Sequence, residues 1–272
     1  MKPMLSSAAT IVPIVLFVAF LGSCASPTAN APAAQRPPDP LPPVKAQEAS
    51  PKERAALHAE LGAGYYERGR MDIALEELNE AQTLDPTNPQ IYNYFGLVYA
   101  MLGENEKAEQ NFRRALSLAP ADSEIRGNWG WYLCSNGKPR QAIPEFEMAL
   151  RNPLYKSPEI ALINAGRCSV EFGDIANAES YYKRALAQSP NSAPAAYGLA
   201  LLAYRAGRLD EARQYMKSLA ALPAPPPEAL FLGMCIERKA GVHSAEAAYV
   251  TQLRNRYPDS AEAKSVTTGR CE

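Results

Sequence analysis

From residue 52 to residue 259 the chain alternates apolar and polar positions with the three- and four-residue spacing of amphipathic helices. The segments are about a dozen residues long and come in pairs. A glycine separates the two segments of each pair, at Gly69, Gly103, Gly137, Gly173, Gly207 and Gly241. Because glycine readily adopts the left-handed conformation that ends a helix, each pair is predicted to be a helical hairpin.

The hairpins recur with a nearly constant period, since successive glycines are 34, 34, 36, 34 and 34 residues apart. Other columns keep the same phase. An apolar residue precedes the glycine by eight positions at Leu61, Phe95, Trp129, Ala165 and Leu199, and an alanine follows it by five at Ala74, Ala108, Ala142, Ala178 and Ala212. With prolines near the repeat ends, this pattern resembles the tetratricopeptide repeat. A lone hairpin cannot bury its apolar face, so the sequence predicts an all-α superhelix of six stacked repeats.

The period also sets the expected boundaries. A repeat domain is expected over residues 52–259, with repeats at 55–88, 89–122, 123–156, 159–192, 193–226 and 226–259. The sixth repeat is degenerate, which is usual for a capping repeat. Residues 260–272 are polar and are expected to form a frayed C-terminal tail.

The N-terminus has the features of a targeting segment. An apolar run from Ala8 to Leu21 is too short to span a membrane comfortably, and it ends in Leu21-Gly22-Ser23-Cys24. This motif resembles the bacterial lipobox, which implies a signal peptide at 1–23 and acylation of Cys24. An ordinary secretory signal is the alternative. The absence of Asp after the cysteine implies the outer membrane, by resemblance to lipoproteins of double-membraned bacteria.

Residues 24–51 are expected to be a tether between the lipid and the repeats. Residues 25–51 contain eight prolines. Such a segment stays extended and semi-rigid rather than forming a helix or a core.

Composition narrows the functional class. The formal net charge is −1, which argues against nucleic-acid binding because that requires a basic surface. The only histidines, His58 and His243, are far apart, and no Cys or His cluster has metal-ligand spacing. No catalytic or phosphate-binding motif occurs. We therefore expect a protein-binding module with no metal and no cofactor rather than an enzyme.

Two of the remaining cysteines are placed to form a disulfide. Cys134 is at position 12 of the first helix of repeat three, and Cys168 is at position 10 of the first helix of repeat four. Two positions rotate a side chain by about 200° around a helix, so one thiol faces forward along the stack and the other faces back. A disulfide is predicted, with two reduced core cysteines as the alternative. The sequence leaves a Cys235–Cys271 pair open.

A binding groove is expected on the concave wall, which in such repeats is formed by first-helix positions 2, 5, 9, 12 and 13. Notable side chains at these positions belong to types enriched at binding hot spots. They are Tyr66, Asn93, Leu97, Met101, Trp131, Arg167, Tyr197, Leu201 and Tyr204. The groove would accept an amphipathic helix or an extended peptide. For each residue, packing or idle exposure is the alternative.

Repeats three and four carry a more specific resemblance. Residues 128–134 read Asn-Trp-Gly-Trp-Tyr-Leu-Cys, residues 152–155 read Asn-Pro-Leu-Tyr, and residues 164–168 read Asn-Ala-Gly-Arg-Cys. These segments resemble type IV pilus biogenesis and stability lipoproteins. The resemblance implies a pilotin, a lipoprotein that carries secretin subunits to the outer membrane and supports their assembly into a multimer. A general envelope scaffold that recruits peptidoglycan enzymes or proteases is the competing hypothesis. An enzyme with a repeat domain is disfavoured, because too few residues remain outside the repeats.

Overall fold

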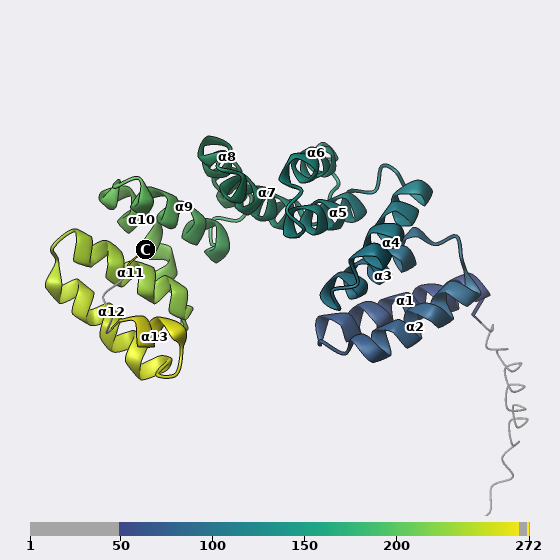
Figure 1. The fold of residues 1–272 in the computed structure, drawn as a ribbon, viewed down its shortest axis with the longest axis horizontal. Helices are drawn as coiled ribbons and strands as arrows, with labels where there is room; N and C mark the ends of the chain where they lie inside the picture. The colour runs from purple at the N-terminus through teal and green to yellow at the C-terminus, as the bar shows by residue number, and fades with distance from the viewer. Residues whose placement is uncertain (1–48, 267–270, 272) are drawn as a thin grey trace, which may run out of the picture. The chain divides into compact units, whose positions relative to one another are not determined.

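The computed structural model describes residues 49–266 and residue 271, and the described residues form helices without strands (Figure 1). The predicted all-α repeat architecture is confirmed. Six hairpins follow one another: α1 (Pro51–Glu67) with α2 (Met71–Leu84), α3 (Pro89–Met101) with α4 (Asn105–Leu118), α5 (Ser123–Ser135) with α6 (Pro139–Leu150), α7 (Pro158–Phe172) with α8 (Ile175–Gln188), α9 (Ala193–Arg205) with α10 (Leu209–Ala220), and α11 (Pro227–Lys239) with α12 (His243–Arg256). A short helix, α13 (Ala261–Ser265), comes last.

Local sequence signals explain where the helices start and stop. At α1, the Ser50 side chain accepts a hydrogen bond from the Glu53 amide, and the Glu53 carboxylate accepts one from the Ser50 amide. This reciprocal capping satisfies two amides that have no partner inside the helix. All six turn glycines have positive φ angles, between 68° and 83°. Larger side chains resist that conformation, which is why glycine recurs at each turn.

Within a hairpin, glycines let the two helices approach each other closely. A Cβ atom at Gly96 would lie 2.9 Å from the ring of Phe112, and one at Gly130 would lie 2.9 Å from the ring of Phe146. Phe112 and Phe146 are fully buried on α4 and α6. The aromatic ring of each second helix thus fills the space that a first-helix side chain would otherwise take.

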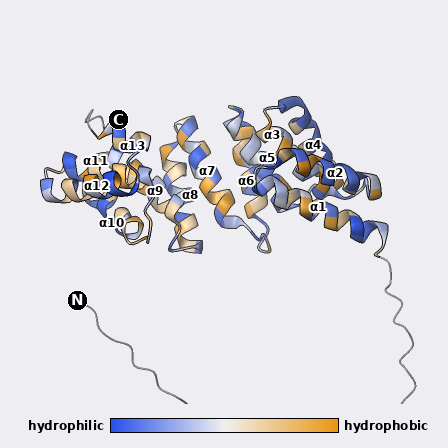
Figure 2. Cartoon of the chain, turned by 90° about the horizontal axis from the view of Figure 1, so that it is seen from below, coloured by the Kyte–Doolittle hydropathy of each residue, from blue (hydrophilic) through white to orange (hydrophobic). Residues whose placement is uncertain are grey.

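Neighbouring hairpins stack so that first helices contact first helices. Contacts join α1 to α3, α3 to α5, α5 to α7, α7 to α9, α9 to α11 and α11 to α13. Figure 2 shows apolar residues following the helices in stripes, with polar residues on the remaining faces. No helix among residues 49–266 is long and apolar enough to cross a bilayer. The predicted signal peptide, Cys24 and the tether up to residue 48 lie outside the described residues.

The structure differs from the expected frayed tail after residue 259. Helix α13 starts 34 residues after α11 and is therefore in phase with the repeats. The Ser260 side chain caps it by accepting a hydrogen bond from the Ala263 amide, and Ala263 and Val266 are buried. The segment folds because it covers the exposed end of the last hairpin, as the first helix of a seventh repeat would.

Candidate protein-binding groove

A groove runs over the face formed by the first helices of repeats four to six. It consists of two pockets of about 490 and 410 Å³, which share Tyr197, Leu201, Arg205 and Glu228 and are therefore continuous. The first pocket is bounded by α7 and α9, and the second by α9, α11 and α13. We call this surface the groove.

Four of the nine predicted binding residues line the groove: Arg167, Tyr197, Leu201 and Tyr204. Sequence reasoning missed Arg205 and Phe231, which also line it. Arg205 is at first-helix position 13 of repeat five, so the repeat register itself could have identified it. Phe231 is at position 6 when repeat six is counted from residue 226, and it falls at position 5 only when the count begins at Pro227, the first residue of α11.

The floor of the groove is aromatic and aliphatic, with charges around it. Burial raises the pKa of the Tyr197 hydroxyl, the nearby Glu228 carboxylate raises it further, and the Arg205 guanidinium opposes them. The Lys239 ammonium makes a cation–π contact with the Tyr204 ring, 5.0 Å from the ring centroid. The surface is therefore apolar in the middle and charged around it.

The predicted binding residues of repeats one to three lie elsewhere. Two of them are buried and do not offer groove surface: Asn93 is 2% exposed and Leu97 is 8% exposed. The Asn128 side-chain amide donates a 3.1 Å hydrogen bond to the side-chain Oδ1 of Asn93, and this links α5 to α3. The prediction fails at these two positions because each side chain takes part in packing between repeats.

The other three residues of those repeats remain partly or fully accessible. Met101 is 55% exposed, near the C-terminal end of α3. Tyr66 and Trp131 are half-buried and pack against the apolar core. None of the three lines either pocket of the groove.

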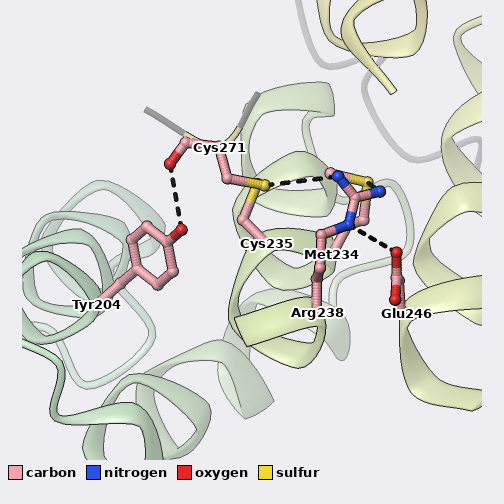
Figure 3. The surroundings of a disulfide bond; sticks show 6 residues. All are labelled: Tyr204, Met234, Cys235, Arg238, Glu246 and Cys271. Atoms are coloured by element: carbon pink, nitrogen blue, oxygen red, sulfur yellow. Dashed lines mark hydrogen bonds and ion pairs between the residues drawn. A yellow bond between two sulfur atoms is a disulfide. The ribbon is translucent and has the colours of Figure 1, made fainter. Parts of the chain in front are cut away.

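Two disulfides join cysteines that are about one repeat apart in the sequence. Cys134 on α5 is bonded to Cys168 on α7, with Cα atoms 5.8 Å apart. Cys235 on α11 is bonded to Cys271, with Cα atoms 5.5 Å apart (Figure 3). The second bond holds Cys271 at the edge of the groove, where both of its cysteines line the second pocket.

Hydrogen bonds also hold Cys271 in place at the edge of the groove. The Tyr204 hydroxyl donates a 3.1 Å hydrogen bond to the Cys271 carbonyl oxygen. The Arg238 guanidinium lies 4.0 Å from the Cys271 sulfur and donates a 2.7 Å hydrogen bond to Glu246 (Figure 3). These contacts connect α9, α11 and α12 to the C-terminal cysteine.

The described residues contain no group of three or more His, Cys, Asp or Glu side chains that could hold a metal ion. His58 is instead paired with Glu77, at 2.7 Å between α1 and α2. His243 lies 3.5 Å from Glu246 on its own helix. Both histidines thus have ordinary structural partners.

Comparison with known proteins agrees with the fold. Four models of the tetratricopeptide repeat match, over residues 62–103, 89–122, 128–193 and 169–229. The chain is 26% identical to the type IV pilus assembly protein PilF of Pseudomonas aeruginosa over 220 residues, which cover 81% of this chain and 87% of PilF.

Solved structures extend the comparison. A crystal structure of PilW, described as a widely conserved type IV pilus biogenesis factor, is 32% identical, with a TM-score of 0.71 over 78% of this chain and 98% of PilW. A structure of PilF from Pseudomonas aeruginosa is 24% identical, with a TM-score of 0.72 over 81% of this chain and 99% of that one. The PilF structure supports the fold, and PilW adds a relative that is similar over nearly its whole length.

Proposed function

The chain belongs to the family of tetratricopeptide-repeat proteins of type IV pilus biogenesis, and on that premise we propose that it is a pilotin. In this role it binds subunits of the pilus secretin and promotes their localisation and multimer assembly at the outer membrane. It is a binding protein, and its contribution requires no chemical step.

The observation that carries the proposal is the combination of family membership with an accessible groove on the repeat face. Aromatic and arginine side chains such as Tyr197, Tyr204 and Arg205 line that groove, and these residue types dominate binding energy at protein interfaces. A secretin segment seated there would be carried wherever the lipoprotein goes.

The lipobox motif would provide the membrane anchor that the proposed mechanism requires. Acyl chains on Cys24 would hold the protein in the outer membrane facing the periplasm, and a multiply acylated cysteine anchors far more stably than one chain does. The proline-rich tether would keep the repeats within tens of ångströms of the lipid, because an extended proline-rich chain gains about 3.1 Å per residue. Delivery then follows from binding and anchoring together.

The decisive experiment deletes the gene and immunoblots separated inner and outer membranes for the secretin multimer. We expect the multimer to be lost or to accumulate in the inner membrane. Wild-type protein should restore it, whereas Cys24→Ala should not. A Met101→Ala variant, which leaves the lipobox and the groove intact, serves as the matched control.

A normal multimer in the outer membrane of the deletion strain would contradict the pilotin role. That result would favour the competing scaffold hypothesis. Recovery of peptidoglycan enzymes or proteases with the wild-type protein, and their absence with groove variants, would support the scaffold.

A further inference from the structure

Over α9, α11 and α13 the groove carries charges of opposite sign on its two long edges. Successive first helices run in the same direction, because the chain reverses once within each hairpin and once more between hairpins. Glu228 and Glu262 stand in the first turns of α11 and α13, at one edge. Arg205 and Lys239 stand in the last turns of α9 and α11, at the other edge.

Arg205, Glu228 and Glu262 line the groove, and the Lys239 ammonium lies beside it, over the ring of Tyr204. Within the described residues none of them forms an ion pair, although fourteen ion pairs are found there. Arg205 and Glu228 line both pockets, and Glu262 lines the second. Between the two edges lies the apolar floor of Tyr197, Leu201 and Phe231.

We propose that the groove binds an amphipathic helix of the partner protein whose apolar stripe is flanked by basic residues on one side and by acidic residues on the other. The basic flank faces Glu228 and Glu262, and the acidic flank faces Arg205 and Lys239. The partner enters in one direction only, since reversing the helix would bring like charges together along both edges. The inference rests on the proposed function only in identifying that partner as the secretin.

The shape of the charged surface selects a helix over an extended strand. Successive side chains of a strand point to opposite faces, so a strand on this floor would direct its remaining side chains away from both edges. A helix presents an apolar stripe with a polar side chain on either flank. Only the helix can therefore satisfy the floor and both edges together.

The C-terminal disulfide maintains one of those edges. Glu262 lies on α13, a helix of only five residues that has little intrinsic stability of its own. The Cys235–Cys271 bond and the hydrogen bond from the Tyr204 hydroxyl to the Cys271 carbonyl hold the end of this segment against α11 and α9. Breaking the bond would release Glu262 from the groove while leaving Glu228, Arg205 and Lys239 in place.

The test uses synthetic helical peptides of about 18 residues, long enough to be helical when bound. All share the same Leu and Ala stripe. One carries Lys on one flank and Glu on the other, a second has the same residues mixed on both flanks, and a third has Lys on both. Fluorescence anisotropy with the full chain in detergent measures each dissociation constant.

We expect the two-sided peptide to bind about five- to tenfold more tightly than the mixed peptide, since each exposed ion pair contributes a fraction of a kcal/mol. In an Arg205→Glu/Lys239→Glu variant both edges are acidic, so the preference should move to the all-Lys peptide. Both substituted side chains are exposed, so the variant should fold.

The disulfide is tested separately. A Cys235→Ser/Cys271→Ser variant should prefer the two-sided peptide by a smaller factor than the wild type, because Glu228 remains and Glu262 is released, whereas Cys134→Ser/Cys168→Ser should keep the full preference. Circular dichroism confirms that each variant is folded.

Equal affinity of the wild type for the three peptides, or the same preference in the charge-reversed variant, would overturn the inference. So would a dimer in sedimentation experiments that excludes the peptide, because a second copy would then be the occupant. Because the peptides replace the secretin, this result is independent of the deletion experiment: selective peptide binding with a normal secretin multimer would contradict the pilotin role alone.

Discussion

A Cβ atom added at Gly198 of α9 would lie 2.6 Å from the ring of Tyr182 on α8. The ring cannot retreat, because a Cβ atom at Gly166 on its other side would lie 2.8 Å away. Tyr182 is 6% exposed and is thus held between two first helices. Stacking of repeats four and five therefore depends on the missing side chain at Gly198.

We expect Gly198→Ala to lower the free energy of unfolding by about 1–3 kcal/mol, because the added methyl group overpacks the Tyr182 ring. Gly64→Ala is the matched control on α1. A Cβ atom at Gly64 meets nothing within 4 Å, so the better helix propensity of alanine should stabilise that variant by about 0.5–1 kcal/mol. Urea unfolding followed by circular dichroism measures both, and equal shifts in the two variants would contradict the packing argument.

The disulfide between repeats three and four should contribute strongly to stability. Its cysteines are 34 residues apart, and closing a loop of that length stabilises the folded state by about 3–4 kcal/mol in the chain-entropy model. We expect Cys134→Ser/Cys168→Ser to lose a comparable amount in urea unfolding. In the presence of a reductant, wild type and variant should converge. A persistent difference under reducing conditions would mean that the serines, not the missing bond, cause the loss.

A pH-dependent contribution should come from the Arg208–Glu179 ion pair between α8 and the turn before α10. The Arg208 guanidinium holds the pKa of the Glu179 carboxyl below its ordinary value of 4.5, with Lys183 adding to the effect. A lowered folded-state pKa stabilises the protein above 4.5, and this stabilisation is lost as the pH falls through the folded-state value.

Arg208→Gln should therefore destabilise the protein slightly at pH 7, because the exposed guanidinium is screened by solvent. The difference from wild type should shrink as the pH falls below 4.5. Lys217→Gln removes one exposed positive charge without breaking an ion pair and controls for net charge. A deficit in Arg208→Gln that stays constant down to pH 3 would show that the carboxylate is not involved.

The groove should account for most of the binding energy if the proposed function is correct. Tyr197 lines both pockets, and removal of a central aromatic side chain typically weakens an interface by about tenfold or more. We expect Tyr197→Ala to weaken binding of purified secretin by that factor. Met101→Ala removes a side chain that is exposed but outside the groove and should bind normally. The opposite ranking would move the site to the second repeat.

The repeat architecture could be predicted because its signals are local and recur. Each turn glycine, such as Gly103, is required by a positive φ angle, and each alanine, such as Ala108, by close helix packing. Every hairpin has the same residue types at the same repeat positions. A repeat that departs from the pattern at one position can therefore still be assigned from its other positions.

The groove was only partly predictable, because side-chain accessibility depends on neighbours from other repeats. Asn93 holds a groove position in the repeat register, yet the Asn128 amide from the next first helix engages it and buries it. The burial of Asn93 depends on a residue 35 positions away, and the repeat pattern of a single repeat does not reveal that contact.

The C-terminal segment was misjudged for a different reason. Its composition is polar, and composition alone favours a frayed tail. Two specific signals favour a helix instead: Ser260 can cap a helix, and α13 begins at Ala261, 34 residues after α11 begins at Pro227. Reading the repeat period past the last glycine would have revealed α13.

The two disulfides also set how the molecule responds to mechanical load. If the proposed lipid anchor holds one end and the proposed partner binds in the groove, the protein is pulled along the chain between them, and helical hairpins unfold when pulled. Cys134 and Cys168 are 34 residues apart, and a chain of that length spans roughly 110 Å when fully extended. Their disulfide prevents this part of the chain from extending. The bond between Cys235 and Cys271 does the same for the end of the array. Under tension the residues outside the two disulfide loops, 49–133 and 169–234, could extend fully, while the residues inside each loop could not.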